Sequence, residues 1–283
     1  MGMKASNAIA TFFKYFVLIL VGLIMIYPLL WMISATFKDN SEIFAGIGLW
    51  IKNPTLEGYK NALNNFGGSI NILQAMLNTY SYVLPKVICT VVSSCIAAYG
   101  FGRFDFPGRK ILFSIMLATL FLPQVVLNVP QFLLYTKFGW VNSPFYLAIW
   151  VHCAFATETY FVYQLVQFMR NVPRDLAAAI DGCNSFQTLY KVIVPMLMPA
   201  LVSCALFQFM WSCNDFMGPL LYVQTPAKYP MSLFVKLSMD GDTGFAWNRI
   251  LALSLISILP QLIVFFCAQD QFVEGISAGA VKG

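Results

Sequence analysis

The sequence predicts an all-α integral membrane protein with six transmembrane helices and with both termini in the cytoplasm. Of its 283 residues, 59% are hydrophobic and 10% are charged, whereas soluble proteins are about 45–50% apolar and about 25% charged. Six long apolar stretches are separated by shorter polar segments. A single water-soluble core cannot bury this much apolar surface, so the expected solvent is lipid.

Each apolar stretch is long enough to cross a bilayer core, which takes about 20 residues. The first follows a short basic segment, but its apolar run is too long for a signal peptide, so we expect an uncleaved helix. The polar segment 36–74 should lie outside the membrane. The expected spans, within one transmembrane domain over residues 1–283, are 16–35, 75–101, 111–135, 144–169, 200–222 and 250–268.

The distribution of basic residues sets the expected orientation. Cytoplasmic loops carry an excess of Lys and Arg, and an inside N-terminus gives the short inner loops six of them. These are Arg103, Arg109, Lys110, Arg170, Arg174 and Lys191. The short outer turn after the third span has only Lys137.

Four ionisable residues interrupt the apolar spans: Lys86, His152, Glu158 and Asp215. A charge at the bilayer centre costs roughly 2.5–3.5 kcal/mol on insertion scales, so such groups usually face a bundle interior or water. In one interpretation they line a solute path, where carboxylates accept hydrogen bonds from hydroxyl groups. In the other, Lys86 pairs with Glu158 or Asp215 or extends to the interface, and His152 is a packing residue.

The third span also holds polar side chains beside two prolines. Gln124, Asn128 and Gln131 lie near Pro123 and Pro130. A proline frees backbone carbonyls that need partners in a dry medium. We expect a kink here whose freed groups are satisfied, and lining of a pathway by Asn128 is the alternative.

The loop at 170–199 predicts a helix, a turn and a second helix. Pro173 suits a first helical turn, and Gly182 suits the residue that ends a helix. Asn184 with Gln187 resembles a capping pair that starts the second helix, and Pro195 should end it. On that helix one apolar face is expected, made by Phe186, Leu189, Tyr190 and Ile193.

An apolar face in a cytoplasmic loop has two interpretations. It packs on its own bundle or along the membrane surface, or it docks in a groove of a partner protein.

The same loop resembles the coupling loop, or EAA motif, of ABC-importer permeases. The matching residues are Ala177, Ala178, Asp181, Gly182, Pro195 and Pro199. Leu176 stands where the family has glutamate, and Asp175 is the nearest acid. Coupling is therefore altered here, or Asp175 substitutes for the glutamate.

Further segments resemble the carbohydrate-uptake branch of these permeases, the family of the maltose permease G type, over nearly the whole chain. They include Pro54–Tyr59, Ala97–Phe101, Phe106–Lys110, Leu117–Thr119, Trp211, Asn214, Phe216, Pro219 and Phe272–Gly275.

The resemblance implies one half of the membrane pathway for a sugar or related polar solute, in a bacterial or archaeal cytoplasmic membrane. The implied partners are a second permease subunit, two cytoplasmic ABC ATPase subunits, an extracytoplasmic solute-binding protein and membrane lipid. ATP and Mg²⁺ are then bound by the ATPase subunits and not by this chain. The implied ATPase-coupling residues are Asp175, Ala177, Ala178, Asp181, Gly182, Phe186 and Tyr190, and the pathway candidates are Glu158, Asp215, Asn128 and His152.

The sequence lacks the motifs of several other classes of protein. The chain has no GxxxxGK[ST], HExxH, GxSxG or CxxC sequence, so we expect no ATP site, no metal site and no catalytic residues. The basic residues form no patch for nucleic acid. The remaining alternatives are a secondary transporter that uses the buried carboxylates as ion carriers, and a membrane enzyme.

Overall fold

The computed structural model describes residues 2–64, 70–171, 183–239 and 246–280, and all regular elements in these ranges are helices. Contacts between residues divide the chain into two compact units. The first unit comprises residues 1–72 and 235–258, and the second comprises residues 73–234 and 259–283.

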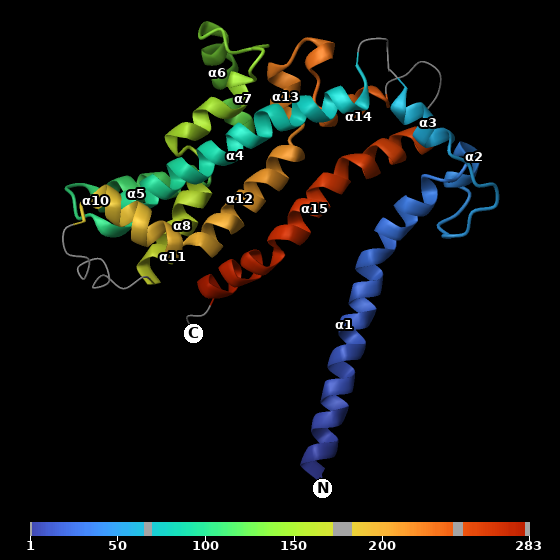
Figure 1. The fold of residues 1–283 in the computed structure, drawn as a ribbon, viewed down its shortest axis with the longest axis horizontal. Coiled ribbons are helices and arrows are strands. Elements are labelled where there is room, and N and C mark those ends of the chain that lie inside the picture. Colours follow the sequence, from blue (N-terminus) through green and yellow to red (C-terminus); the bar gives the residue numbers. More distant parts are fainter. Residues whose placement is uncertain (1, 65–69, 172–182, 240–245, 281–283) are drawn as a thin grey trace. The chain divides into compact units, whose positions relative to one another are not determined.

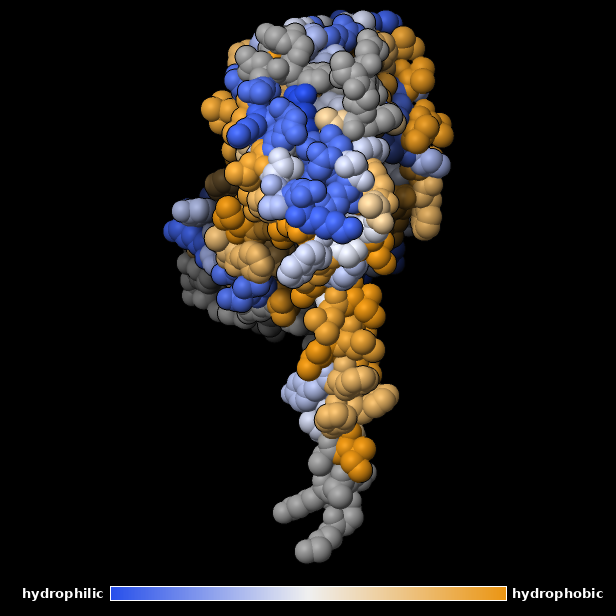
Figure 2. Space-filling view, turned by 90° about the vertical axis from the view of Figure 1, so that its right-hand side faces the viewer, coloured by the Kyte–Doolittle hydropathy of each residue, from blue (hydrophilic) through white to orange (hydrophobic). Residues whose placement is uncertain are grey.

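The first unit begins with the long helix α1 (Gly2–Ala35), which is apolar and exposed nearly all round from Ile9 to Leu30. Phe12 is 72% exposed and Met25 is 71% exposed, and Figure 2 shows this helix as an almost continuous hydrophobic column. A helix that is apolar all round is stable only in a buried or lipid environment. The first predicted span is therefore a helix of the expected kind, and it starts earlier than residue 16.

The polar segment after α1 folds against the beginning of the last helix, within the first unit. Lys38 is only 2% exposed and donates from Nζ to the carbonyl of Gly48 at 2.6 Å. A Cβ atom at Gly58 would lie 2.6 Å from the backbone oxygen of Asn248, so this close approach requires glycine. The helices involved are α2 (Asn40–Ile43), α3 (Glu57–Leu63) and the start of α15 (Trp247–Ala280).

The second unit is built around the long helix α4 (Ile72–Arg103), with shorter helices packed along it (Figure 1). Its other elements are α5 (Arg109–Thr119), α6 (Gln124–Lys137), α7 (Leu147–Trp150), the 3₁₀ helix η1 (Val151–Phe155), α8 (Thr159–Asn171), α10 (Ser185–Thr188), the π-helix η2 (Leu189–Ile193), α11 (Val194–Met196), α12 (Met198–Cys213), α13 (Met217–Tyr222), the 3₁₀ helix η3 (Pro226–Lys228), most of α14 (Met231–Leu237) and the end of α15.

Two buried clusters hold this unit together, one at each end of α4. Near the C-terminal end, Tyr99 packs with side chains of α8 and α12, among them Leu165 and Cys204. Near the N-terminal end, Tyr82 packs with side chains that include Tyr146 and Phe209. All seven cysteines are free.

Three helices in the described ranges are long and apolar enough to cross a membrane, and up to five spans result if each of two bent pairs is counted as one. The long helices are Ile9–Ala35, Ile72–Arg103 and Trp247–Val273. They contain the predicted spans 16–35, 75–101 and 250–268.

In the structure, the other three predicted spans are not single continuous helices. The stretch 111–135 bends by 100° between α5 and α6, because Pro123 lies at the break and has no N–H to continue the helix. The stretch 144–169 is interrupted at Ala156, whose φ of 54° is left-handed. The stretch 200–222 is interrupted at residues 214–216, between α12 and α13.

Candidate functional site

Three helix breaks of the second unit, at Pro123, at Ala156 and at residues 214–216, border one polar cavity of about 480 Å³. The residues after each break supply side chains to its wall, and α4 supplies Lys86. The polar and aromatic residues that line it are Lys86, Gln124, Asn128, Gln131, Tyr135, His152, Thr157, Glu158, Asp215 and Tyr222. Non-helical backbone at membrane depth is tolerated where it is buried in protein or lines a water-filled cavity. The cavity therefore explains why the non-helical backbone at these breaks is tolerated.

One wall of the cavity is a polar stripe along α6. Gln124, Asn128, Gln131 and Tyr135 recur at three- and four-residue spacing, which puts them on one face of a helix. Gln124 donates from Nε2 to Oε1 of Gln131 at 3.3 Å. The predicted alternative, in which Asn128 lines a cavity and does not only accompany a kink, agrees with this geometry.

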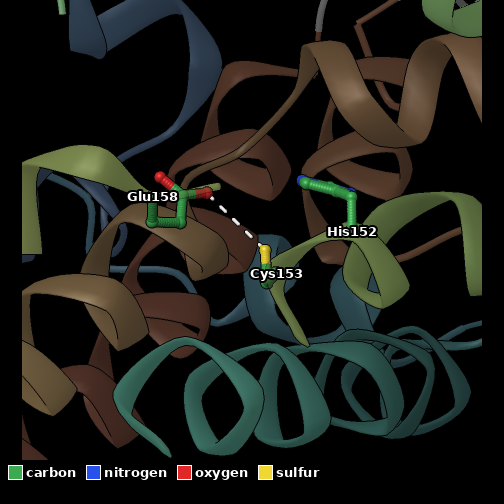
Figure 3. Close-up of side chains that lie close together, drawn as sticks. All are labelled: His152, Cys153 and Glu158. Atoms are coloured by element: carbon green, nitrogen blue, oxygen red, sulfur yellow. Dashed lines mark hydrogen bonds between the residues drawn. The ribbon is translucent and has the colours of Figure 1, made fainter. Parts of the chain in front are cut away.

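A second wall comes from the break between η1 and α8. The thiol of Cys153 donates to Oε1 of Glu158 at 3.6 Å, and the two side chains point toward one another (Figure 3). The hydroxyl of Thr157 donates to the carbonyl of His152 at 3.0 Å, which satisfies one backbone group freed by the break. The left-handed backbone at Ala156 makes this tight connection possible, and such strained residues often occur at functional sites.

The third wall is the break between α12 and α13. The backbone N–H of Gly218 donates to Oδ1 of Asp215 at 2.9 Å, so this carboxylate caps the start of α13. Its other oxygen, Oδ2, lies 4.0 Å from Nζ of Lys86. The side chains of Lys86 and Asp215 are 12% and 25% exposed. Of the two pairings that the sequence left open for Lys86, the structure therefore contains the one with Asp215.

His152, Cys153 and Glu158 are also the residues most suited to binding a metal in the described part of the chain. Their ligand atoms lie within 4.8 Å of one another. A structural zinc site takes four ligands, and a cysteine ligand must be deprotonated. Here the thiol of the fully buried Cys153 keeps its proton and donates a hydrogen bond to Glu158, and Lys86 lines the same cavity. We assign no metal to this cluster.

The cavity combines the groups that bind polyhydroxylated molecules. Two carboxylates accept hydrogen bonds, three side-chain amides both donate and accept, and Lys86 donates. The rings of Tyr135 and Tyr222, with centroids 5.5 Å apart, add an apolar aromatic surface. Such a mixture of an apolar wall and a few convergent polar groups is typical of small-molecule sites.

The structure brings together all four predicted pathway residues, Asn128, His152, Glu158 and Asp215, and each is partly buried in the wall of this cavity. Their contact with solute stays a prediction. Our sequence reasoning missed Tyr135, Thr157 and Tyr222. For Tyr135 a signal was present, because it continues the helical spacing of Gln124, Asn128 and Gln131.

The predicted coupling loop, 170–199, is described except for residues 172–182, so Asp175, Leu176, Ala177, Ala178, Asp181 and Gly182 lie outside the described residues. The predicted capping pair is confirmed, since Asn184 accepts from the N–H of Gln187 at 2.8 Å and Gln187 accepts from the N–H of Asn184 at 3.0 Å. The hydroxyl of Tyr99 donates to the carbonyl of Ser185 at 3.0 Å and ties this loop to α4.

The single apolar face predicted for this helix is divided in two. Leu189 and Ile193 are buried in the core of the second unit, whereas Phe186 is 74% exposed and Tyr190 is 68% exposed. The π-helical turn η2 contributes to this division, because its wider turn departs from the periodicity of an α-helix.

The helix break predicted at Pro195 is present, one residue beyond it. The helical path continues to Met196 and bends by 78° where α12 follows. Pro195 lies in the first turn of α11, where a missing N–H is tolerated.

The chain was compared with known proteins. Residues 90–274 match the family model described as binding-protein-dependent transport system inner membrane component. A probable ABC transporter permease protein of Pyrococcus horikoshii is 30% identical over 271 residues, which are 93% of this chain and 94% of the relative. The trehalose/maltose transport system permease protein of Thermococcus litoralis is 30% identical over 267 residues, 94% of each chain.

The fold is also similar to that of a solved structure. A chain of a bacterial ABC transporter involved in the import of the acidic polysaccharide alginate matches with a TM-score of 0.76. The match covers 94% of this chain and 98% of that chain at 19% sequence identity. At this identity the likeness concerns the fold.

Proposed function

Because this chain belongs to the family of inner membrane components of binding-protein-dependent transport systems, we propose that it forms half of the membrane pathway of an ABC importer. It is a transport component and not an enzyme, in keeping with its family. The observation that carries the proposal is the polar cavity at the three helix breaks of the second unit. Polar and ionisable side chains within membrane spans are costly and usually mark a substrate or ion pathway. So many of them around one cavity therefore support a pathway.

In this proposal the chain crosses the cytoplasmic membrane of a bacterium or archaeon six times. The three long helices each form one span, and the broken pairs α5–α6, α7–α8 and α12–α13 form the other three. Both termini are then cytoplasmic, which puts Arg103, Lys110, Arg170 and Lys191 on the inner side, as the positive-inside rule favours.

The solute is a sugar or a related polar molecule. Relatives of the chain include permease proteins named for trehalose/maltose and for galactooligosaccharides. The carboxylates of Glu158 and Asp215 accept hydrogen bonds from sugar hydroxyl groups, and the amide of Asn128 can both accept and donate them. His152 lies just before the break at Ala156, and its ring packs on that of Tyr135 at a centroid distance of 6.2 Å.

The complete transporter contains a second permease subunit, two cytoplasmic ABC ATPase subunits and an extracytoplasmic solute-binding protein. ATP and Mg²⁺ bind to the ATPase subunits. Residues 170–199 of this chain contact one ATPase, through Asp175, Ala177, Ala178, Asp181 and Gly182 of the motif and through the exposed rings of Phe186 and Tyr190. Exposed aromatic rings on a short helix are typical anchors for a groove on a partner.

The geometry of the loop suggests how movement reaches the cavity. Leu189 and Ile193 pack in the same buried cluster as Leu165 of α8 and Cys204 of α12. Helix α8 begins at one break that borders the cavity, and α12 ends at another. When ATP draws the ATPase subunits together, a displaced loop moves α8 and α12 with it, and the cavity opens to the other side. ATP must bind the two states with different affinity for this to occur.

The test uses the chain co-expressed with an ABC ATPase subunit of the carbohydrate-uptake class. We expect the ATPase to copurify with the wild-type chain, and Tyr190→Ala with Phe186→Ala to reduce the yield. The matched control is Phe145→Ala, because Phe145 is 70% exposed but lies at the opposite predicted side of the membrane. Uptake by the reconstituted transporter should require ATP. Uptake that follows an ion gradient without any ATPase would instead identify a secondary transporter.

A further inference from the structure

A second cavity of the second unit, about 800 Å³ in volume, lies where the end of α4, the start of α5 and the end of α8 meet. It shares no lining residue with the polar cavity described above. Its lining residues are Phe101, Asp105, Phe106, Pro107, Gly108, Arg109, Lys110, Ile111, Phe113 and Arg170. The proposed solute pathway does not use them.

The charge of this cavity is positive. Arg109, Lys110 and Arg170 line it against a single acidic residue, Asp105. The guanidinium of Arg109 is paired with Asp105, four residues before it. Lys110 and Arg170 then supply the net charge, and the cavity includes the first turn of α5, where the positive end of the helix dipole favours an anion.

Aromatic rings line the cavity, and one of them contacts the basic residue Arg170. The ring of Phe101 lies 6.0 Å from that of Phe106 and 5.5 Å from that of Phe113. The guanidinium of Arg170 lies over the ring of Phe113, 5.8 Å from its centroid. Close packing of α4 on α8 sets this arrangement, because a Cβ atom at Gly102 would lie 3.1 Å from Cβ of Met169.

An apolar surface continues from the cavity along α5. Ile111 is 67% exposed, Leu112 is 50% exposed and Ile115 is 57% exposed. A shallow groove lined by Lys110, Ile111, Ser114, Ile115 and Ala118 runs in the same direction. The cavity thus joins a basic group at the predicted cytoplasmic interface to an apolar strip on a helix within a predicted span. Basic side chains beside an apolar strip are complementary to a phospholipid, which joins a phosphate headgroup to acyl chains.

We propose that this cavity binds an anionic phospholipid of the inner leaflet. Lys110 and Arg170 hold the headgroup phosphate, and one acyl chain follows Ile111 and Ile115 along α5. Basic pockets between helices on the cytoplasmic side are suited to such headgroups. A peptide of a partner protein fits less well, because the apolar strip lies on a helix within a predicted span.

The test is native mass spectrometry of the delipidated chain, titrated with dioleoylphosphatidylglycerol or dioleoylphosphatidylcholine. We expect the wild type to bind the anionic lipid about tenfold more tightly than the neutral one, from two charges near a membrane surface. Lys110→Gln with Arg170→Gln should remove this preference, and Lys110→Arg should keep it. Lys137→Gln, an exposed lysine of the predicted outer side, is the matched control and should change nothing.

Four outcomes would overturn the proposal. The wild type could show no preference, or the Lys110/Arg170 variant could keep it. Inorganic phosphate or glycerol 3-phosphate could displace the lipid headgroup at millimolar concentration, which would identify a site for soluble anions. The variant could lose an ATPase subunit on copurification while its lipid binding is unchanged, which would make the cavity a protein contact. None of these results depends on uptake, so they are distinct from failure of the proposed importer function.

Discussion

The pair of Lys86 and Asp215 gives a prediction whose magnitude follows from the structure. Two unit charges about 4 Å apart interact by about 4 kcal/mol at an effective dielectric constant of about 20. The side chains are 12% and 25% exposed and the distance of 4.0 Å is at the limit for an ion pair, so solvent screening lowers this value to about 1–2 kcal/mol. Lys86→Met leaves the Asp215 charge without its partner and should destabilise the chain. Adding Asp215→Asn should restore part of the loss.

The assay is a double-mutant cycle on the free energy of unfolding in mixed micelles of SDS and a mild detergent. The expected coupling between Lys86→Met and Asp215→Asn is about 1–2 kcal/mol. Glu158 provides the matched control, since it lines the same cavity but is not the partner of Lys86. Lys86→Met and Glu158→Gln should add within about 0.5 kcal/mol. A larger coupling with Glu158 than with Asp215 would refute the assigned pairing.

Two further predictions concern single sites. Gly58→Ala forces a methyl group to within 2.6 Å of a backbone oxygen of Asn248 and should lower stability by about 1–3 kcal/mol, whereas Gly46→Ala, with nothing within 4 Å, should have little effect; equal effects in thermal inactivation assays would count against the close approach. Glu158→Gln should raise the half-saturation concentration for uptake about tenfold if its carboxylate accepts a hydrogen bond from solute, and unchanged affinity and rate would remove Glu158 from the list of solute contacts.

The parts of the fold that the sequence predicted well are those that depend on local composition. The apolar runs that became α1, α4 and α15 need no partner to be recognised, because length and hydrophobicity define a membrane helix. The capping pair of Asn184 and Gln187 is likewise local, since its hydrogen bonds join residues three positions apart.

The helix breaks could not be placed with the same success. Pro123 indicated a kink, but Ala156 carries no sequence signal for its left-handed backbone, because alanine favours helices. At the break at residues 214–216, the N–H of Gly218 donates to Asp215, and Lys86 approaches Asp215 from the distant helix α4. A long-range contact such as that of Lys86 cannot be read from the local sequence.

The sequence predicted individual residues of the candidate site, but it did not predict that they surround one cavity. Asn128, His152, Glu158 and Asp215 attracted notice because polar groups are rare in membrane spans. Periodicity alone does not place them around one cavity, because they come from three different breaks. The division of the coupling helix into buried Leu189 and exposed Tyr190 was also hidden, since both are apolar and adjacent.

The central claim is that the polar cavity lies on the solute pathway, and cysteine accessibility tests it most directly. In a chain whose seven cysteines are replaced by alanine or serine, Asn128→Cys reports on the cavity, and Val129→Cys reports on the neighbouring position, which is 68% exposed and outside the cavity lining. A membrane-impermeant thiol reagent is applied from each side of the reconstituted transporter, with and without ATP.

The account predicts that Asn128→Cys reacts from the aqueous phase and that ATP changes its rate by about tenfold or more, equivalent to about 1.4 kcal/mol. Val129→Cys should react slowly in both states. If Asn128→Cys is unreactive from both sides, or reacts at one rate whatever the nucleotide state, the cavity is not part of an alternating pathway and the central claim is wrong.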